Sequence, residues 1–345
     1  EVRASSAGDS TTKSTVSLAR GPFGFLPELK GWREVEGAWV LQPEGRPKAV
    51  VHFLGGAFIG AAPHLSYTAV MEALVAAGYV VVCTPYLLTF KHLESARGVE
   101  SMFAAAVSAL ALEDPGVAGL PVYGVGHSNG ALLQLLLGTF ADREHYRANV
   151  IMSFNSKPVS EAIPGGLPEG AGGLLSGLRS MARTLPVEGT LQAALNAVPL
   201  LSAVRGDALV ASVLPVAQQV GGVLAEIADG TLEFEPTPEG SKDMVAEGYE
   251  VPRNLLVMFD DDSFDETPDI RDILASPSVS ARGVQFEVLL MEGWHGAPCG
   301  VDLGWQPGGA FSPVDAVGMA VKEQVLKNTK GVARKVVSWL DEQAV

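Results

Sequence analysis

Short apolar runs alternate with segments of helical spacing along most of this chain. The apolar runs end at glycine, proline or polar residues and predict strands at Ala49–Leu54, Tyr79–Thr84, Pro121–Val125, Asn149–Phe154, Asn254–Phe259 and Phe286–Met291. The segments between them predict helices at Ser66–Ala77, Glu94–Leu112, Gly130–Phe140, Pro268–Leu274 and within Val314–Leu340. Gly31–Leu41 predicts one or two edge strands. This alternation predicts an α/β fold with a mostly parallel sheet that helices cover on both faces.

The alternation stops between residues 158 and 250, which predicts an insertion after the strand at 149–154. Its segments Leu174–Ala182 and Leu209–Ile227 are amphipathic, whereas the tail Phe234–Lys242 predicts a loop because it holds two prolines and a glycine. A segment this long without strands favours a helical cap over a bare loop. The apolar faces of the cap either cover a greasy substrate or pack on the sheet. The resulting plan has a flexible arm at 1–18, a core at 19–157 and 251–345, and the cap at 158–250.

Composition and charge narrow the class of partner. Of the 345 residues, 47% are hydrophobic and 18% are charged, which fits a folded chain with a large core. The net charge of −15 repels phosphate backbones and anionic head groups, so nucleic acid is not an expected partner. The most apolar stretch, Ala208–Ile227, is interrupted by Pro215 and by Gln218 and Gln219, so we predict no transmembrane helix.

Neither a metal nor a cofactor is expected. Cys83 and Cys299 form no CxxC unit, and we expect two free thiols, with Cys83 buried in a strand, rather than a disulfide. The acidic turn at 260–266 lacks the glycine of a calcium-binding EF-hand loop. The glycines after Leu54 match no phosphate-binding or dinucleotide-binding loop pattern.

The run Gly126-His127-Ser128-Asn129-Gly130 fits the pattern G-x-S-x-G. It lies between a predicted strand and a predicted helix, which is the context that a nucleophile on a tight turn requires. Glycines two positions before and after the serine let strand and helix approach closely. The turn also places the next backbone N–H at a helix N-terminus, where negative charge is stabilised. Ser128 is therefore the candidate nucleophile.

A serine nucleophile needs a base, and the base needs an acid that orients it. His295 follows the last predicted strand directly, at the sheet edge where ligands bind in α/β folds, and is the expected base. The acid is expected in the acidic turn that follows Phe259. We favour Asp262, because an acid two or three residues past the strand end suits the turn, and Asp261 and Asp265 are the alternatives.

Two backbone N–H groups are needed to stabilise the oxyanion that forms on an attacked carbonyl. The N–H of Asn129 is one candidate. The second should come from the glycine-rich loop after Leu54, where Gly56 and Ala57 are the best candidates because backbone can approach a substrate there.

The other histidines are assigned no chemistry. His52 lies in a predicted strand and should be a hydrogen-bonded core residue. His64 and His92 fall in connecting segments near strand ends, and His145 lies in a charged segment that is expected at the surface.

With these residues in place, the chain from Trp32 onwards resembles the α/β-hydrolase superfamily. More narrowly, the run VVHFLGGAFIGAAPHLSYTAVMEALVAAGYVVVCTPY and the turn FDDDSFDET are similar to a family found in cyanobacteria and in the plastids of algae and plants. The algal and cyanobacterial type of chlorophyllase, a serine esterase with a G-H-S-x-G turn, resembles this group. Plant chlorophyllases usually carry a second glycine after that turn, where this chain has Ala131.

The resemblance implies Ser128, Asp262 and His295 as a catalytic triad and the release of phytol from chlorophyll as the reaction. We therefore expect a serine esterase acting on a hydrophobic ester, with peripheral membrane contact through the cap. A general lipid esterase, an acyltransferase and a non-catalytic pigment- or lipid-binding protein are the alternatives. The resemblance also implies a plastid location, or the cyanobacterial cytoplasm or thylakoid surface, and a first residue other than Met fits a removed leader or a trimmed chain.

Overall fold

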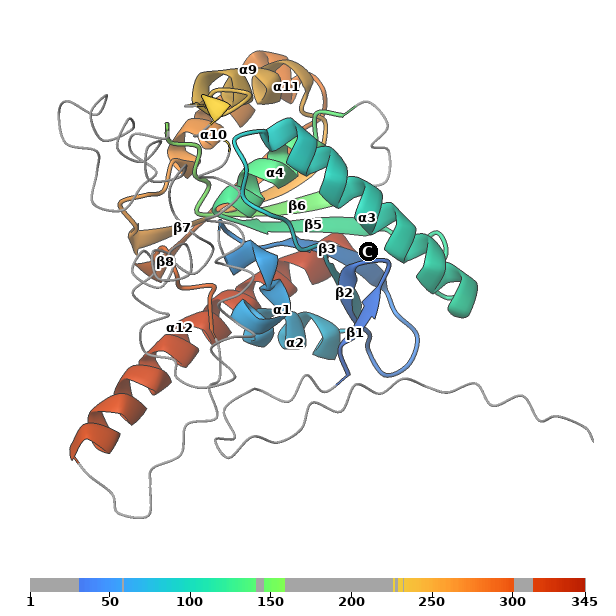
Figure 1. Ribbon diagram of the computed structural model, residues 1–345, viewed down its shortest axis with the longest axis vertical. Helices are drawn as coiled ribbons and strands as arrows, with labels where there is room; N and C mark the ends of the chain where they lie inside the picture. Colours follow the sequence, from blue (N-terminus) through green and yellow to red (C-terminus); the bar gives the residue numbers. More distant parts are fainter. Residues whose placement is uncertain are drawn as a thin grey trace, which may run out of the picture.

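A single sheet runs through the centre of the molecule (Figure 1). The computed structural model describes residues 31–57, 59–140, 146–158, 226, 229–231, 233–300 and 313–344, so the predicted arm, most of the predicted cap and His145 lie outside the described residues. The strands are β1 (Arg33–Val35), β2 (Ala38–Leu41), β3 (Ala49–Leu54), β4 (Tyr79–Cys83), β5 (Val122–His127), β6 (Tyr146–Met152), β7 (Arg253–Asp261) and β8 (Gln285–Trp294). Their order across the sheet is β1-β2-β4-β3-β5-β6-β7-β8, and β2 runs opposite to all the others.

The central strands are apolar because helices cover both faces of the sheet. Every residue of β3 and β5 is buried, since successive side chains point into the two cores in turn. One helical layer holds α3 (His92–Glu113), α4 (Asn129–Leu137), α9 (Pro238–Gly248), α10 (Thr267–Leu274) and α11 (Pro277–Ser280). The other holds α1 (Pro63–Ser66), α2 (Thr68–Ala76) and α12 (Pro313–Gln343), and a 3₁₀ turn, Ile59–Ala61, precedes α1 (Figure 1).

The predicted strands and helices of the core are confirmed, with strand ends that differ by no more than three residues. The predicted helix Ser66–Ala77 corresponds to α2, and a break at Tyr67, whose φ of −123° and ψ of 22° leave the helical region, separates it from the short helix α1 before it. The break turns the Tyr67 side chain into the protein, where it is completely buried.

The prediction of a loop over Phe234–Lys242 is wrong for its second half, which begins α9. The Thr237 side chain accepts a hydrogen bond from the N–H of Gly240 at 3.1 Å, and Pro238 occupies the first helical position. Proline and threonine therefore act here as the start signals of a helix rather than as breakers. The helix buries Val245 and packs against α4, in the helical layer of the core.

The three described histidines that lie outside the candidate site, His52, His64 and His92, are buried. His52 is a core residue as predicted, with its ring nitrogens 2.6 and 2.7 Å from the hydroxyls of Tyr146 and Thr84. His64 and His92 were expected in connecting segments, but they lie in α1 and at the start of α3. The ring of His64 stacks on Trp39 and the ring of His92 stacks on Phe234, so both histidines are packed into the protein rather than left in loops. Burial lowers the pKa of each to about 4.

Both cysteines are free, and Cys83 is buried in β4, as predicted. Among the described residues, no helix combines the length and the apolar composition needed to cross a bilayer.

Candidate active site

Ser128 lies on the tight turn between β5 and α4. Its φ of 56° and ψ of −122° are strained values for a residue with a side chain, as expected for a serine that is lifted out of the sheet. The two glycines of the motif make this turn possible. A Cβ on Gly126 would lie 2.5 Å from the carbonyl oxygen of Gly130, and one on Gly130 would lie 2.3 Å from that of Leu54.

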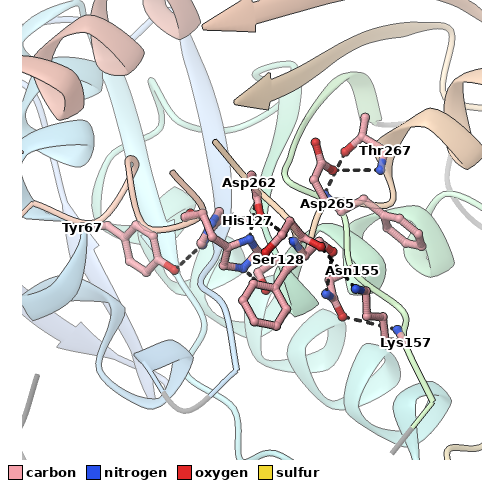
Figure 2. A network of polar contacts seen from close by, with 12 residues as sticks. Tyr67, His127, Ser128, Asn155, Lys157, Asp262, Asp265 and Thr267 are labelled. Carbon is pink, nitrogen blue, oxygen red and sulfur yellow. Dashed lines mark hydrogen bonds and ion pairs between the residues drawn. The ribbon is translucent and has the colours of Figure 1, made fainter. Parts of the chain in front are cut away.

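The structure brings together the expected nucleophile, base and acid (Figure 2). The Nε2 atom of His295 is 2.9 Å from Oγ of Ser128, and its Nδ1 atom is 2.8 Å from Oδ2 of Asp262. A carboxylate can only accept, so Nδ1 carries the hydrogen. In the neutral imidazole, Nε2 then presents a lone pair to the serine hydroxyl, which is the arrangement a general base needs.

Asp262 is held in its charged form. Burial of its side chain would raise its pKa, but the hydrogen bonds from His295 and from the N–H of Phe264 lower the pKa below its ordinary value. The turn that carries it is tied to the segment after β6, because Asn155 donates to the carbonyl oxygen of Phe264 at 2.8 Å and Glu266 N–H donates to that of Phe154 at 2.8 Å.

The two alternative acids do not contact His295. Asp261 is the last residue of β7 and is exposed. Asp265 turns away and accepts the N–H of Thr267 at 2.8 Å (Figure 2). Burial raises the pKa of Asp265, and the negative charge of Asp262 adds to the rise. Of the three acids that the sequence allowed, Asp262 is therefore the one that is hydrogen-bonded to His295.

The base loop, Gly293–Ala297, begins with the last two residues of β8. The carboxylate of Asp260 accepts the N–H of Gly293 at 2.9 Å, which fixes the loop to the end of β7. Gly293 has a φ of 144°, a value that side chains rarely tolerate. His295 thus stands on a turn that both neighbouring strands position.

The oxyanion loop, Gly55–Ala57, lies beside Ser128. A Cβ on Gly56 would be only 3.2 Å from that of Ser128, so this backbone borders the nucleophile. Of the two donors expected here, Gly56 is already engaged, because its N–H donates to the Tyr67 hydroxyl at 2.7 Å. That leaves Ala57, together with Asn129 at the first position of α4, where a helix has unpaired N–H groups.

Three polar side chains that the sequence did not single out surround the site. The Tyr86 hydroxyl donates to the carbonyl oxygen of Gly55 at 2.6 Å. His127 places its Nδ1 atom 2.8 Å from the Tyr67 hydroxyl and its Nε2 atom 2.8 Å from the carbonyl oxygen of His295 (Figure 2). Of these three residues, only His127 could have been predicted from the sequence, because it lies inside the G-x-S-x-G motif. The two tyrosines belong to no local sequence pattern.

Large apolar side chains are exposed at the same edge of the sheet. Phe264 is 42% exposed and lies edge-on to His295, with ring centroids 5.8 Å apart. Trp294, which precedes His295, is 55% exposed, and Leu87, which follows Tyr86, is 57% exposed. We call Phe264, Trp294 and Leu87 the apolar rim.

The strand order, the reversed second strand and the serine on the turn after the fifth strand together define the α/β-hydrolase fold. Within this class, the family described as "Protein of unknown function (DUF1350)" has a model that matches residues 31–342. The chain belongs to this family.

Solved structures that resemble the chain share little sequence with it. The thioesterase domain from the curacin biosynthetic pathway is 16% identical over 86% of this chain and 98% of that one, with a TM-score of 0.43. An esterase of Pyrococcus furiosus is 11% identical over 89% and 86%, with a TM-score of 0.44. A carboxyl esterase from Bacillus coagulans is 12% identical over 91% and 98%, with a TM-score of 0.42. No curated protein matches. The fold assignment rests on the strand order described above.

Proposed function

We propose that this protein is a serine hydrolase that cleaves hydrophobic carboxylic esters through an acyl-enzyme. The observation that carries the proposal is the hydrogen-bonded series of Asp262, His295 and Ser128, with distances of 2.8 and 2.9 Å. The series has the required direction, since the acid holds the hydrogen of Nδ1 and leaves Nε2 free to accept the serine proton.

In the first half of the reaction, Oγ of Ser128 bonds to the ester carbonyl carbon while His295 takes the hydroxyl proton. The negative charge that develops on the carbonyl oxygen is stabilised by the N–H groups of Asn129 and Ala57. The tetrahedral intermediate then collapses, the bond to the alcohol oxygen breaks, and His295 returns the proton to that oxygen. The alcohol leaves and the acyl group stays on Ser128.

In the second half, water attacks the acyl carbon and gives its proton to His295. The bond to Oγ breaks, the proton passes to Oγ, and the acid leaves, so the enzyme is restored with no cofactor consumed. The charge of Asp262, whose pKa lies below its ordinary value, stabilises the imidazolium in both halves.

The apolar rim supports a substrate with a long hydrocarbon part. Phe264 and Trp294 flank His295 and keep much of their surface exposed. Covering such surface with a substrate chain contributes roughly 0.8 kcal/mol for each buried CH₂ group, so long esters gain affinity that short ones lack.

Within this class, we propose the phytyl ester of chlorophyll as the first substrate to test. The support is the resemblance of the G-H-S-x-G turn at Gly126–Gly130 and of the acidic turn to chlorophyllase-like proteins, together with the apolar rim. A location in a plastid or a cyanobacterium would follow from the same reaction.

The test is an ester panel with matched variants. Short and long p-nitrophenyl esters and chlorophyll a are given to the wild type, to Ser128→Ala and to Ser108→Ala, which changes an exposed serine of α3. A fluorophosphonate probe is applied to the same three proteins. We expect hydrolysis and labelling in the wild type and in Ser108→Ala, and neither in Ser128→Ala.

The other outcomes select an alternative. Undiminished hydrolysis by Ser128→Ala would overturn the mechanism. Failure of the wild type both to hydrolyse and to react with the probe would favour a pigment- or lipid-binding protein. Formation of a new ester when an alcohol is added would favour an acyltransferase.

A further inference from the structure

We propose that His127 is a positioning residue that couples the oxyanion loop to the base loop through Tyr67. The inference rests on the proposed function, because it concerns how the two halves of that site are kept in register. It is carried by three consecutive hydrogen bonds: Gly56 to Tyr67, Tyr67 to His127, and His127 to the backbone of His295.

The position of each hydrogen in this series is fixed by its partner. The carbonyl oxygen of His295 can only accept, so Nε2 of His127 must carry a hydrogen and donate it at 2.8 Å. Burial, and then the charge that His295 can carry, lower the pKa of His127 to about 3, so its Nδ1 atom is an unprotonated acceptor at neutral pH.

The remaining two bonds follow from that acceptor. The Tyr67 hydroxyl must donate to Nδ1 of His127 at 2.8 Å, and burial raises the pKa of Tyr67, so the phenol keeps its proton. Its oxygen then has a free lone pair for the N–H of Gly56, at 2.7 Å. All three bonds point the same way, from the oxyanion loop to the base loop.

The series passes directly behind the nucleophile. His127 precedes Ser128 in the chain, and a Cβ on Gly56 would lie 3.2 Å from that of Ser128. His295 is held through its side chain, by Ser128 and Asp262, and through its carbonyl oxygen, by His127. Ser128 therefore sits inside a ring of contacts that joins it to both loops.

The two side chains of this series are buried. Tyr67 is 0% exposed and His127 is 2% exposed. Hydrogen bonds in such surroundings are stronger than in water and polarise one another. A broken member would leave a buried polar group without a partner, which is costly, so the loops keep one arrangement.

Catalysis needs this kind of fixation. Oxyanion donors are effective when they are aimed before the substrate arrives, and a shift of about 1 Å can cost on the order of 100-fold in rate. Ala57 stabilises the oxygen of the attacked carbonyl and His295 takes the proton of the attacking serine, and the two residues lie on loops far apart in sequence. The coupling through Tyr67 and His127 keeps their spacing constant.

Three conservative variants divide the series at known points. Tyr67→Phe removes the shared hydroxyl. In His127→Gln the amide nitrogen can replace Nε2 and still donate to His295, but nothing accepts from Tyr67. In His127→Asn the amide oxygen can replace Nδ1 and still accept from Tyr67, but it does not reach the base loop. Tyr249→Phe is the matched control, because its hydroxyl is also buried and hydrogen-bonded, in the core beside Asn254.

Ester hydrolysis and inhibition by an aryl boronic acid, which forms an anionic tetrahedral adduct on serine, give the first readout. We expect kcat to fall by roughly 10- to 100-fold in Tyr67→Phe and His127→Gln with KM little changed, and the Ki of the boronic acid to rise in parallel. The double variant Tyr67→Phe with His127→Gln should lose no more than the worse single variant. Tyr249→Phe should keep wild-type kcat and Ki.

Amide hydrogen exchange gives a readout that does not depend on activity. Tyr67→Phe should speed exchange in the base loop, and His127→Asn should speed it in the oxyanion loop, although in each case the substituted side chain makes no hydrogen bond to the loop in question. Wild-type kcat and Ki in Tyr67→Phe, or exchange that changes only in the loop to which the substituted side chain is hydrogen-bonded, would overturn the coupling. Absence of hydrolysis and of probe labelling in the wild type would instead overturn the proposed function, and the exchange result would still decide the coupling.

Discussion

Gly130 at the start of α4 is in contact with Leu54 at the end of β3. A Cβ at this position would lie 2.3 Å from the carbonyl oxygen of Leu54 and 2.5 Å from that of Gly55. Both neighbours are backbone, so no side chain can move to make room. The second glycine of the motif is thus required by packing between the turn and the oxyanion loop.

We predict that Gly130→Ala destabilises the protein by about 3 kcal/mol, because strand and helix must separate. Gly98→Ala is the control, since Gly98 lies in α3 with nothing within 4 Å of an added Cβ, and it should stabilise by about 0.5–1 kcal/mol. Urea unfolding of both variants measures the difference. Equal stability would show that the turn yields more readily than its contacts suggest.

The choice of Asp262 as the acid can be tested by three identical substitutions. Asp262→Asn should lower kcat by about 10³–10⁴-fold, because an amide nitrogen facing Nδ1 favours the wrong tautomer of His295. Asp261→Asn and Asp265→Asn should stay within a few-fold of wild type, since neither carboxylate contacts His295. A large loss in Asp265→Asn with an active Asp262→Asn would reverse the assignment.

Stability should fall in acid because buried histidines resist protonation. The pKa of His92 is lowered from 6.5 to about 4 by burial, so between these values the unfolded chain binds a proton that the folded chain refuses. The associated stability is complete above pH 6.5 and is lost as pH falls toward 4, at up to about 1.4 kcal/mol per pH unit.

His92→Phe should remove that part of the acid sensitivity. Both ring nitrogens of His92 are buried without a hydrogen-bond partner among the described residues, and the ring stacks on Phe234, so an apolar ring loses no described bond there. We expect higher stability than wild type at neutral pH and a growing advantage as the pH is lowered to about 4.5. Parallel urea titrations at several pH values measure it, and an unchanged slope would argue against the prediction.

Chain-length selectivity should depend on the apolar rim. Phe264→Ala is predicted to lower kcat/KM for a long-chain ester roughly ten-fold relative to a short one, through lost contact with the hydrocarbon. Leu112→Ala, at the far end of α3 and 88% exposed, should leave the ratio unchanged. A ratio that does not respond to Phe264 would place the acyl chain elsewhere.

The strand pattern and the motif predicted the framework because both are local. β3 falls at Ala49–Leu54 as predicted, since its six buried residues are bounded by Lys48 and Gly55. Ser128 and His295 could be predicted because each closely follows a predicted strand. The acid required more, because Asp261, Asp262 and Asp265 share one turn and only its path decides which of them faces His295.

The contacts behind Ser128 could not be predicted, because they join distant segments. The break at Tyr67 has no proline or glycine to mark it, and its hydroxyl meets Gly56 and His127 only after three segments have packed. For the same reason the sequence could not tell that the N–H of Gly56 is engaged. The start of α9 was missed because its proline and glycine are helix-start and turn residues alike.

The ends of β3, β5, β7 and β8 each contribute one part of the site, and these strands are drawn from almost the whole described chain. Contacts between distant segments form only after the entropy of closing the loops between them has been offset, so we expect the parts to meet late in folding. Hydrolysis of a chromogenic ester during refolding would therefore report the final docking of β8 rather than early collapse. A fragment that lacks β3 or β8 should be inactive, because it would lack the oxyanion loop or the base loop and the site is complete only in the whole sheet.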